Sequence, residues 1–245
     1  MYKVDTKIRY SECGEDGKIK LGSIINQFQD TSSAHSEALG VGMEYLMEKK
    51  RAWVLNSWQI VIERYPDAYE KVEVSTWPTG FKGVFGPRNF CMKTPEGEMI
   101  AYANSLWVYI ETETGKPTKP DEEEKQIYGV EAPLEMEYAS RKIKMPEQSK
   151  VVDTIRVRKY HIDTNSHMNN SQYVQMAMEV MPDGFKAKQL RVEYKKSAVY
   201  GDKIVLKLGV EEERTVVELC DETDHVYAVV EFIGDRKSTR LNSSH

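Results

Sequence analysis

The chain has 245 residues, a length that allows one large domain or two domains of about 100 residues each. With 40% hydrophobic and 30% charged residues, it has the composition of a globular protein, which excludes the disordered and fibrous classes. The net charge is −5, and no apolar run approaches the roughly 20 residues that a membrane span needs. We therefore expect neither a nucleic-acid partner nor a membrane span.

The first ten residues lack the apolar core of a signal peptide and the Ser and Arg richness of a transit peptide. They predict the first strand of a cytoplasmic protein. The three cysteines, Cys13, Cys91 and Cys220, are widely spaced, which argues against a disulfide framework and against a zinc site. We expect no bound metal and no cofactor.

In the first half, a helix is expected over residues 30–50, because Ala34, Ala38 and Leu39 begin a pattern of small and apolar residues at three- and four-residue steps. Four prolines and an acidic run without periodicity predict a linker at residues 112–150. Strands are expected between that helix and the linker at residues 58–62, 72–77, 84–92 and 99–110.

In the second half, apolar periodicity predicts a helix from about residue 169 to Met181, and Pro182 prevents its continuation. The last eight residues, 238–245, do not continue the strand pattern and resemble a non-native tail, so we exclude them. Strands are expected after the helix at residues 190–195, 203–212, 214–220 and 226–233.

The two halves repeat the same order of elements. Asp30 and Asp163 each open a segment that leads into a predicted helix, 133 residues apart, and Tyr69 and Tyr200 follow the next strand, 131 residues apart. This nearly constant offset indicates duplicated units in an α+β fold, each a helix embedded among antiparallel strands. We expect the first unit at residues 1–115, a linker at 116–150 and the second unit at 151–235.

The most informative stretch runs from Asp163 to Asn170, directly before the second predicted helix. Asp163, Asn165 and His167 alternate, so an extended or turning backbone directs all three side chains to one side. A helix beginning at about Asn169 or Asn170 would direct its unpaired N–H groups to the same place. A base, an amide and an anion-stabilising helix end together suit hydrolysis of an activated carbonyl. Each residue alone also suits a turn, a helix cap or a structural histidine.

One pattern in this duplicated chain of helices and sheets resembles the signature of the acyl-acyl-carrier-protein thioesterases. The pattern is Asp163-x-Asn165-x-His167-x-Asn169-Asn170-x-x-Tyr173. The resemblance covers residues 1–235, and the N-terminus favours the bacterial branch. It implies a tandem double hot-dog fold, in which each antiparallel sheet wraps around a long central helix. Supporting matches are Gln27-x-x-Asp30 with His35, and Glu193-Tyr194-Lys195-Lys196 followed by Tyr200-Gly201-Asp202.

The activity that this resemblance implies is hydrolysis of the acyl-carrier thioester, which releases free fatty acid and ends chain elongation. The leaving thiolate needs little acid assistance, because the pKa of such a thiol is about 8.5, so the site must activate water and stabilise an oxyanion. We assign His167 as general base and Asn165 as the group that positions the water or the carbonyl. Asp163 would orient His167 or act on the water directly. Backbone N–H groups near Asn169 would polarise the thioester oxygen.

The sequence departs from the family pattern at the fourth catalytic position. After a segment like Glu193-Tyr-Lys-Lys, plant members carry an acidic residue and often a cysteine, whereas this chain has Ser197 and Ala198. The departure excludes a cysteine nucleophile and leaves Ser197 as the weak candidate for the fourth group.

The implied partner is an acidic acyl carrier protein with its acyl-phosphopantetheine. Residues 141–203 hold 13 Lys and Arg against 7 Asp and Glu, which suits an acidic partner but also ordinary solvated strands. The docking candidates are Arg156, Arg158, Lys159, Lys195 and Lys196. The acyl chain needs an apolar slot in the first unit, and its candidates, which equally suit plain core, are Met43, Leu46, Trp58 and Trp77.

Two other functions stay open on the sequence. An acyl-CoA thioesterase would use the same fold with a different substrate handle. A non-catalytic acyl-binding module is the other possibility, and the intact Asp, Asn and His set counts against it. The chain is expected to be a monomer or a homodimer.

Overall fold

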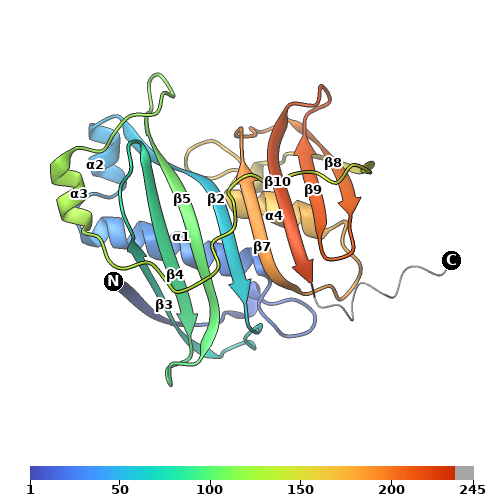
Figure 1. The fold of residues 1–245 in the computed structure, drawn as a ribbon, viewed down its shortest axis with the longest axis horizontal. Helices are drawn as coiled ribbons and strands as arrows, with labels where there is room; N and C mark the ends of the chain where they lie inside the picture. The colour runs from blue at the N-terminus through green and yellow to red at the C-terminus, as the bar shows by residue number, and fades with distance from the viewer. Residues whose placement is uncertain (235–245) are drawn as a thin grey trace. The chain divides into compact units, whose positions relative to one another are not determined.

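The computed structural model describes residues 1–234, and the chain divides into two compact units. Unit 1 contains Met1–Ser57 and Glu63–Tyr138, and unit 2 contains Trp58–Ile62 and, within the described residues, 139–234. Each unit has an antiparallel sheet with a helix against one face, so the α+β prediction is confirmed (Figure 1). The expected tail at residues 238–245 lies outside the described residues.

Unit 1 has the strand order β1-β3-β4-β5-β2, and α1 packs against β3 and β1. The pairs β1–β3, β3–β4 and β4–β5 are antiparallel. Its strands are β1 (Tyr2–Lys7), β3 (Lys71–Pro78), β4 (Phe85–Lys93), β5 (Met99–Glu111) and the first part of β2 (Arg51–Ile62), whose last five residues belong to unit 2. Its helices are η1 (Tyr10–Glu12), α1 (Leu21–Ala38), α2 (Met43–Glu48) and α3 (Glu122–Tyr128).

The single helix expected at residues 30–50 is wrong, because the structure has α1 and α2 in that region. Helix α1 begins at Leu21, since Ile24, Ile25 and Phe28 give it a buried apolar face that the sequence pattern missed. Asp30, expected at the helix start, lies inside α1. Gly40, with φ +74°, ends the helix by taking the left-handed conformation that glycine adopts at low cost.

Unit 2 has the strand order β7-β10-β9-β8-β6, and α4 packs against β10 and β9. The pairs β7–β10, β10–β9, β9–β8 and β8–β6 are all antiparallel. Its strands are β6 (Lys150–Arg156), β7 (Ala187–Tyr194), β8 (Lys203–Val210), β9 (Thr215–Cys220) and β10 (Val226–Gly234), and its helices are η2 (Lys159–His161) and α4 (Asn170–Met178).

The expected start of the second helix is confirmed, because Asn169 is the N-cap of α4 and Asn170 is its first residue. The helix ends at Met178, three residues before the Met181 predicted from the position of Pro182. Tyr173, Val174 and the other buried residues of α4 face the sheet.

Backbone hydrogen bonds reveal how the two units correspond. In unit 1 an isolated antiparallel β-bridge between Cys13 and Ile19 closes the loop that leads into α1. In unit 2 a β-bridge between Ile162 and Met168 closes the loop that leads into α4. Gly17 (φ +72°) and Ser166 (φ +62°) occupy the same turn position in these loops. Equivalent positions in the two loops are thus 149 residues apart in sequence, not 133. The difference arises because the helix that follows the loop is longer in unit 1 than in unit 2.

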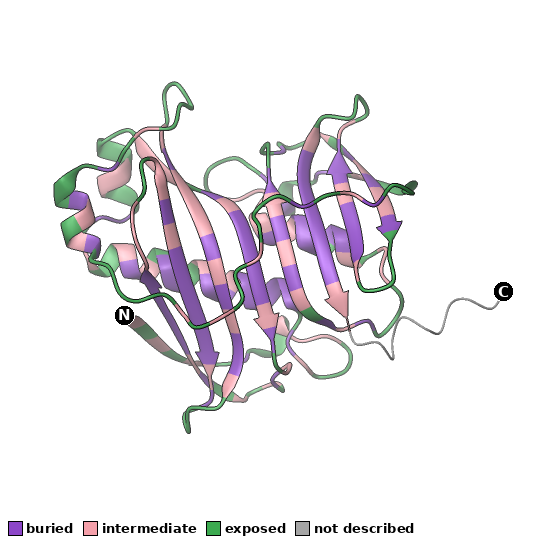
Figure 2. Ribbon diagram, in the orientation of Figure 1, coloured by how far each residue is buried: buried purple, intermediate pink, exposed green. Residues whose placement is uncertain are grey.

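The stretch expected as a linker is more ordered than its composition suggested. It contains α3, and the boundary between the units lies between Tyr138 and Ala139. Residues 131–138 also cover one face of the unit 1 sheet, where the N–H of Leu134 donates to Asn89 of β4. With α1 on the other face, β4 is buried over most of its length (Figure 2). In residues 1–234, no helix is long and apolar enough to cross a membrane.

Candidate active site

The motif loop, residues 162–168, joins η2 to α4 in unit 2. Its backbone closes on itself, because the N–H of Asp163 donates to the carbonyl of His167 at 2.8 Å. The Asp163 carboxylate fixes the same turn: Oδ1 accepts the N–H groups of Asn165 (2.8 Å) and His167 (3.3 Å). This is the local bonding that favours aspartate in turns. Asp163 therefore holds the backbone that carries the other two candidates.

His167 and Asn165 are both exposed on this loop. Within residues 1–234, neither the imidazole nor the carboxamide makes a hydrogen bond to the protein, and none joins Asp163 to the imidazole. The structure therefore brings the three expected residues onto one short loop. It leaves the polar atoms of His167 and Asn165 available to a substrate or a water molecule.

The start of α4 offers fewer free donors than the sequence predicted. The Asn169 side chain accepts the N–H of Ser171 at 2.9 Å, and its carbonyl accepts the N–H of Gln172 at 2.9 Å. The N–H of Asn169 itself donates to His161 at 2.9 Å. Among residues 169–172 of the described chain, only Asn170 keeps an N–H without a protein acceptor. The expectation of several free N–H groups near Asn169 is wrong, because an Asn cap uses them.

The β7–β8 loop, residues 195–202, lies beside the motif loop. The N–H of Met168 donates to the carbonyl of Ala198 at 2.8 Å, which joins the two loops directly. Ser197 precedes Ala198 and is exposed. Asp202 closes the loop by accepting the N–H of Val199 (3.0 Å) and the hydroxyl of Tyr227 (2.9 Å). Ser197 is therefore on the loop that borders His167, although nothing in the sequence spacing required this.

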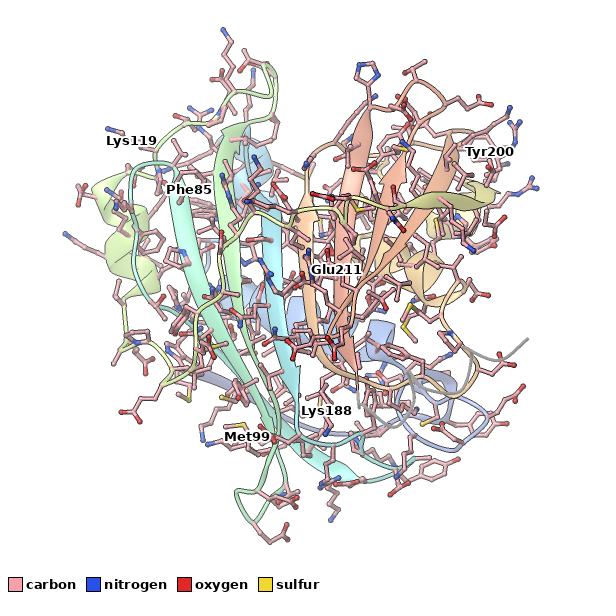
Figure 3. All side chains as sticks on the ribbon, turned by 45° about the vertical axis from the view of Figure 1, so that its right-hand side comes forward. Phe85, Met99, Lys119, Lys188, Tyr200 and Glu211 are labelled. Atoms are coloured by element: carbon pink, nitrogen blue, oxygen red, sulfur yellow. The ribbon has the colours of Figure 1, made fainter. Side chains whose placement is uncertain are left out.

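The five basic docking candidates are all exposed in unit 2. The Nζ atom of Lys159 lies 6.0 Å from the centroid of the Tyr200 ring. Tyr200 is exposed on the β7–β8 loop (Figure 3). Tyr160, next to Lys159, is 79% exposed. Exposed aromatic rings among exposed cations suit a protein partner better than a purely solvated face.

The four slot candidates have different surroundings. Met43 is 57% exposed, which does not fit the lining of a closed apolar slot. Leu46 is half-buried, and Trp58 is buried in unit 2. The Trp77 indole donates to the carbonyl of Ala132 at 2.9 Å, so it faces the segment that covers the sheet.

A buried polar cluster in unit 1 was not predicted. His35, one of the residues that support the family resemblance, is in the last turn of α1, so it does not stand at a helix start as His167 does. Its Nδ1 accepts from Arg88 Nη1 at 3.0 Å, since a guanidinium can only donate. Arg88 is 8% exposed, also donates to Thr76 at 3.2 Å, and lies over the Tyr128 ring. The sequence around Arg88, which follows Pro87 in a predicted strand, gave no indication that its guanidinium is buried beside His35 and Tyr128.

Comparison with known proteins decides the family. Residues 1–128 match the model of the acyl-ACP thioesterase N-terminal domain, and residues 144–233 match that of the C-terminal domain. The chain belongs to the acyl-ACP thioesterase family. It is 28% identical over 198 residues to a chloroplastic acyl-[acyl-carrier-protein] hydrolase of Cuphea viscosissima, covering 74% of this chain and 47% of that protein. A palmitoyl-acyl carrier protein thioesterase of Arabidopsis thaliana is 27% identical over 216 residues, covering 80% and 52%. The chain thus spans about half the length of the curated relatives it matches.

Solved structures support the double hot-dog fold that the sequence predicted for this acyl-ACP thioesterase family member. A Bacteroides thetaiotaomicron acyl-ACP thioesterase has a TM-score of 0.86 at 24% identity, covering 95% of this chain and 97% of that one. The 12:0-ACP thioesterase of Umbellularia californica has a TM-score of 0.84 at 19% identity, with 96% of each chain covered.

Proposed function

We propose that the protein hydrolyses the thioester of an acyl-acyl carrier protein and releases the free fatty acid. The observation that carries this proposal is the motif loop: Asp163 holds it, and His167 and Asn165 stand on it with no protein hydrogen bond in the described chain. Membership of the acyl-ACP thioesterase family supports the same reaction.

In the proposed reaction, His167 takes a proton from a water molecule, and the hydroxide attacks the thioester carbon. The tetrahedral intermediate then expels the carrier thiolate, which accepts a proton, so water is consumed and a carboxylic acid and a thiol are formed. Asn165 positions the water or the carbonyl. The free N–H of Asn170 polarises the thioester oxygen, a contribution on the order of 3 kcal/mol for one good donor.

Asp163 has a double role in this scheme. Its Oδ1 holds the backbone of the motif loop, and its negative charge, four residues from His167, stabilises the imidazolium that forms during proton transfer. Ser197 is a candidate for the fourth group, as a donor to the reacting water. Unit 1, whose equivalent loop reads Gly14-Glu-Asp-Gly-Lys18, lacks this set, and we assign it to binding the acyl chain.

The proposed partner is the acidic carrier protein that presents the acyl-phosphopantetheine. Arg156, Arg158, Lys159, Lys195 and Lys196 are its proposed docking residues, because they surround the motif loop in sequence and are exposed. Their positive charge favours encounter with an acidic surface.

The deciding experiment compares His167→Ala with wild type on acyl-carrier and acyl-CoA thioesters, measuring thiol release and free fatty acid. We expect the kcat of the variant to fall about 10²- to 10⁴-fold, the usual contribution of a general base. His225→Ala is the matched control, since His225 is an exposed histidine on the β9–β10 turn of the same unit. Its activity should equal that of wild type.

The outcomes separate the alternatives. Hydrolysis of acyl-CoA with a higher kcat/KM than acyl-carrier protein would replace the proposed substrate with CoA thioesters. Binding of acyl substrate without hydrolysis of either would make the protein an acyl-binding module. Full activity in His167→Ala would refute the assigned base.

A further inference from the structure

We infer that Tyr173 is a positioning residue: its hydroxyl sets the distance between the motif loop and the β7–β8 loop, and with it the placement of His167. This inference rests on the proposed function for its consequence in catalysis. Its structural content can be tested without any activity.

The two loops meet at Ala198, whose backbone carbonyl and backbone N–H make hydrogen bonds to different partners. Its carbonyl accepts the N–H of Met168 at 2.8 Å, and its own N–H donates to the Tyr173 hydroxyl oxygen at 2.8 Å. Ala198 is fully buried and Tyr173 is 2% exposed, so water does not compete at either bond. The residue after His167 is thus connected through Ala198 to a side chain anchored in α4.

The anchor itself is held by packing. The Tyr173 ring packs edge-on against Tyr194 of β7, with centroids 5.7 Å apart. The Tyr194 hydroxyl in turn donates to the carbonyl of Asn170 at 3.0 Å. Tyr173 therefore cannot change rotamer without disturbing α4 and β7, which makes it a rigid reference for both loops.

Unit 1 serves as an internal comparison. There the N–H of Ile19 donates to the carbonyl of Pro66 at 3.0 Å, the same bond that Met168 makes to Ala198. Pro66 has no N–H to donate, and Ile24 occupies the helix position of Tyr173. The carbonyl bond is thus common to both units, whereas the tyrosine bond exists only in the unit that carries Asp163, Asn165 and His167.

The surroundings of the hydroxyl agree with a place between the two loops. The pKa of Tyr173 is raised to about 12, chiefly by burial and to a smaller extent by the negative charges of Asp202 on the β7–β8 loop and Asp163 on the motif loop, although the hydrogen bond from the Ala198 N–H lowers it. The hydroxyl is therefore protonated at neutral pH. It acts as a fixed hydrogen-bond acceptor and takes no part in proton transfer.

The kinetic test is Tyr173→Phe, which keeps the ring and removes only the hydroxyl. We expect kcat to fall about tenfold with KM within twofold of wild type, because small misplacement of a catalytic group lowers the chemical rate more than binding. Tyr109→Phe is the control: Tyr109 is also buried, and its hydroxyl also makes a hydrogen bond, to Glu124 in unit 1. Its kcat should not change.

A double-mutant cycle identifies the partner of the hydroxyl. Ala198→Pro removes the donor and reproduces the residue found in unit 1. If Tyr173 acts through the Ala198 N–H, adding Tyr173→Phe to that background leaves kcat unchanged. An equal loss of kcat in both backgrounds would overturn the inference.

Amide hydrogen exchange gives a second readout that needs no substrate and also serves if Ala198→Pro fails to fold. In Tyr173→Phe, exchange should accelerate at Ala198 and at Met168 together, while Tyr109→Phe leaves both amides protected. Unchanged protection at either amide contradicts the inference. A wild-type protein that hydrolyses no acyl thioester would refute the proposed function alone, because the exchange result would still decide the role of Tyr173.

Discussion

At the scale of single residues, burial and hydrogen bonding give chemically identical histidines different roles. His167 is exposed on the motif loop with no protein hydrogen bond in the described chain, whereas His35 is buried against Arg88 and stacks on Tyr2 with ring centroids 5.3 Å apart. Burial, together with the smaller effect of the Arg88 charge, lowers the pKa of His35 to about 4. His161 is also buried, and its Nδ1 accepts the N–H of Arg158 at 3.0 Å, a structural role.

The low pKa of His35 predicts a loss of stability in acid. In the unfolded chain the imidazole titrates near 6.5, so between about pH 6.5 and 4 the unfolded state binds the extra proton. The stabilisation is complete above pH 6.5 and is lost as the pH falls towards 4. His35→Gln keeps an acceptor for Arg88 and removes this titration. Its free energy of unfolding should fall less steeply over that window, by up to about 1.4 kcal/mol per pH unit.

Denaturant titrations at several pH values measure this difference. His225→Gln, at a position that is mostly exposed, is the control and should retain the slope of wild type. If His35→Gln also retains the full wild-type slope, His35 is not the titrating group. His161 continues to contribute in both proteins, because burial lowers its pKa as well.

The segment after Tyr138 shows what the sequence missed at the scale of elements. Glu231 of β10 is 2% exposed and accepts from Arg191 and Arg214 at 2.7 Å each. The same two guanidinium groups also donate to backbone carbonyls of the segment after Tyr138, namely those of Ser140, Lys142 and Lys144. Ile143 of that segment packs on Val216 and Val229. A stretch with proline and charge but no periodicity is therefore fixed on the sheet of unit 2.

Removing the charge of Glu231 should release this segment. Glu231→Gln leaves the partly buried Arg191 without a carboxylate and leaves Arg214 with Glu211 alone, and we expect a loss of about 3 kcal/mol in the free energy of unfolding. Trypsin should then cleave faster after Lys142 and Lys144. Glu218→Gln is the control on the neighbouring strand, because its contact with Lys207 is 3.7 Å long and that pair contributes about 1 kcal/mol or less. Equal cleavage rates in both variants would contradict this role of Glu231.

Charge is unevenly distributed at the scale of the whole molecule, with a basic region inside an acidic chain of net charge −5. If residues 156–159 dock an acidic carrier, Lys159→Glu should raise KM for acyl-carrier substrate about fivefold to tenfold and leave kcat nearly unchanged. Added salt should raise the wild-type KM and narrow the difference between the proteins.

A small acyl-pantetheine thioester, which lacks the protein surface, should show neither effect. Lys71→Glu changes an exposed lysine at the start of β3 in unit 1 and is the matched control. An equal rise in KM for both variants would mean that net charge, and not a docking surface near Lys159, governs the encounter.

The amino-acid sequence by itself determined the family, the duplicated α+β fold and the motif from Asp163 to Asn170, because alternating strand patterns and a dense polar motif are local signals. Only the tertiary structure decided where α1 begins, which N–H groups at the start of α4 are already bonded, and how Ala198 joins Met168 to Tyr173. These depend on hydrogen bonds and burial between residues distant in sequence, and a pattern of neighbouring residues contains no information on such partners. For the same reason, only the fold distinguished an exposed His167 from a buried His35.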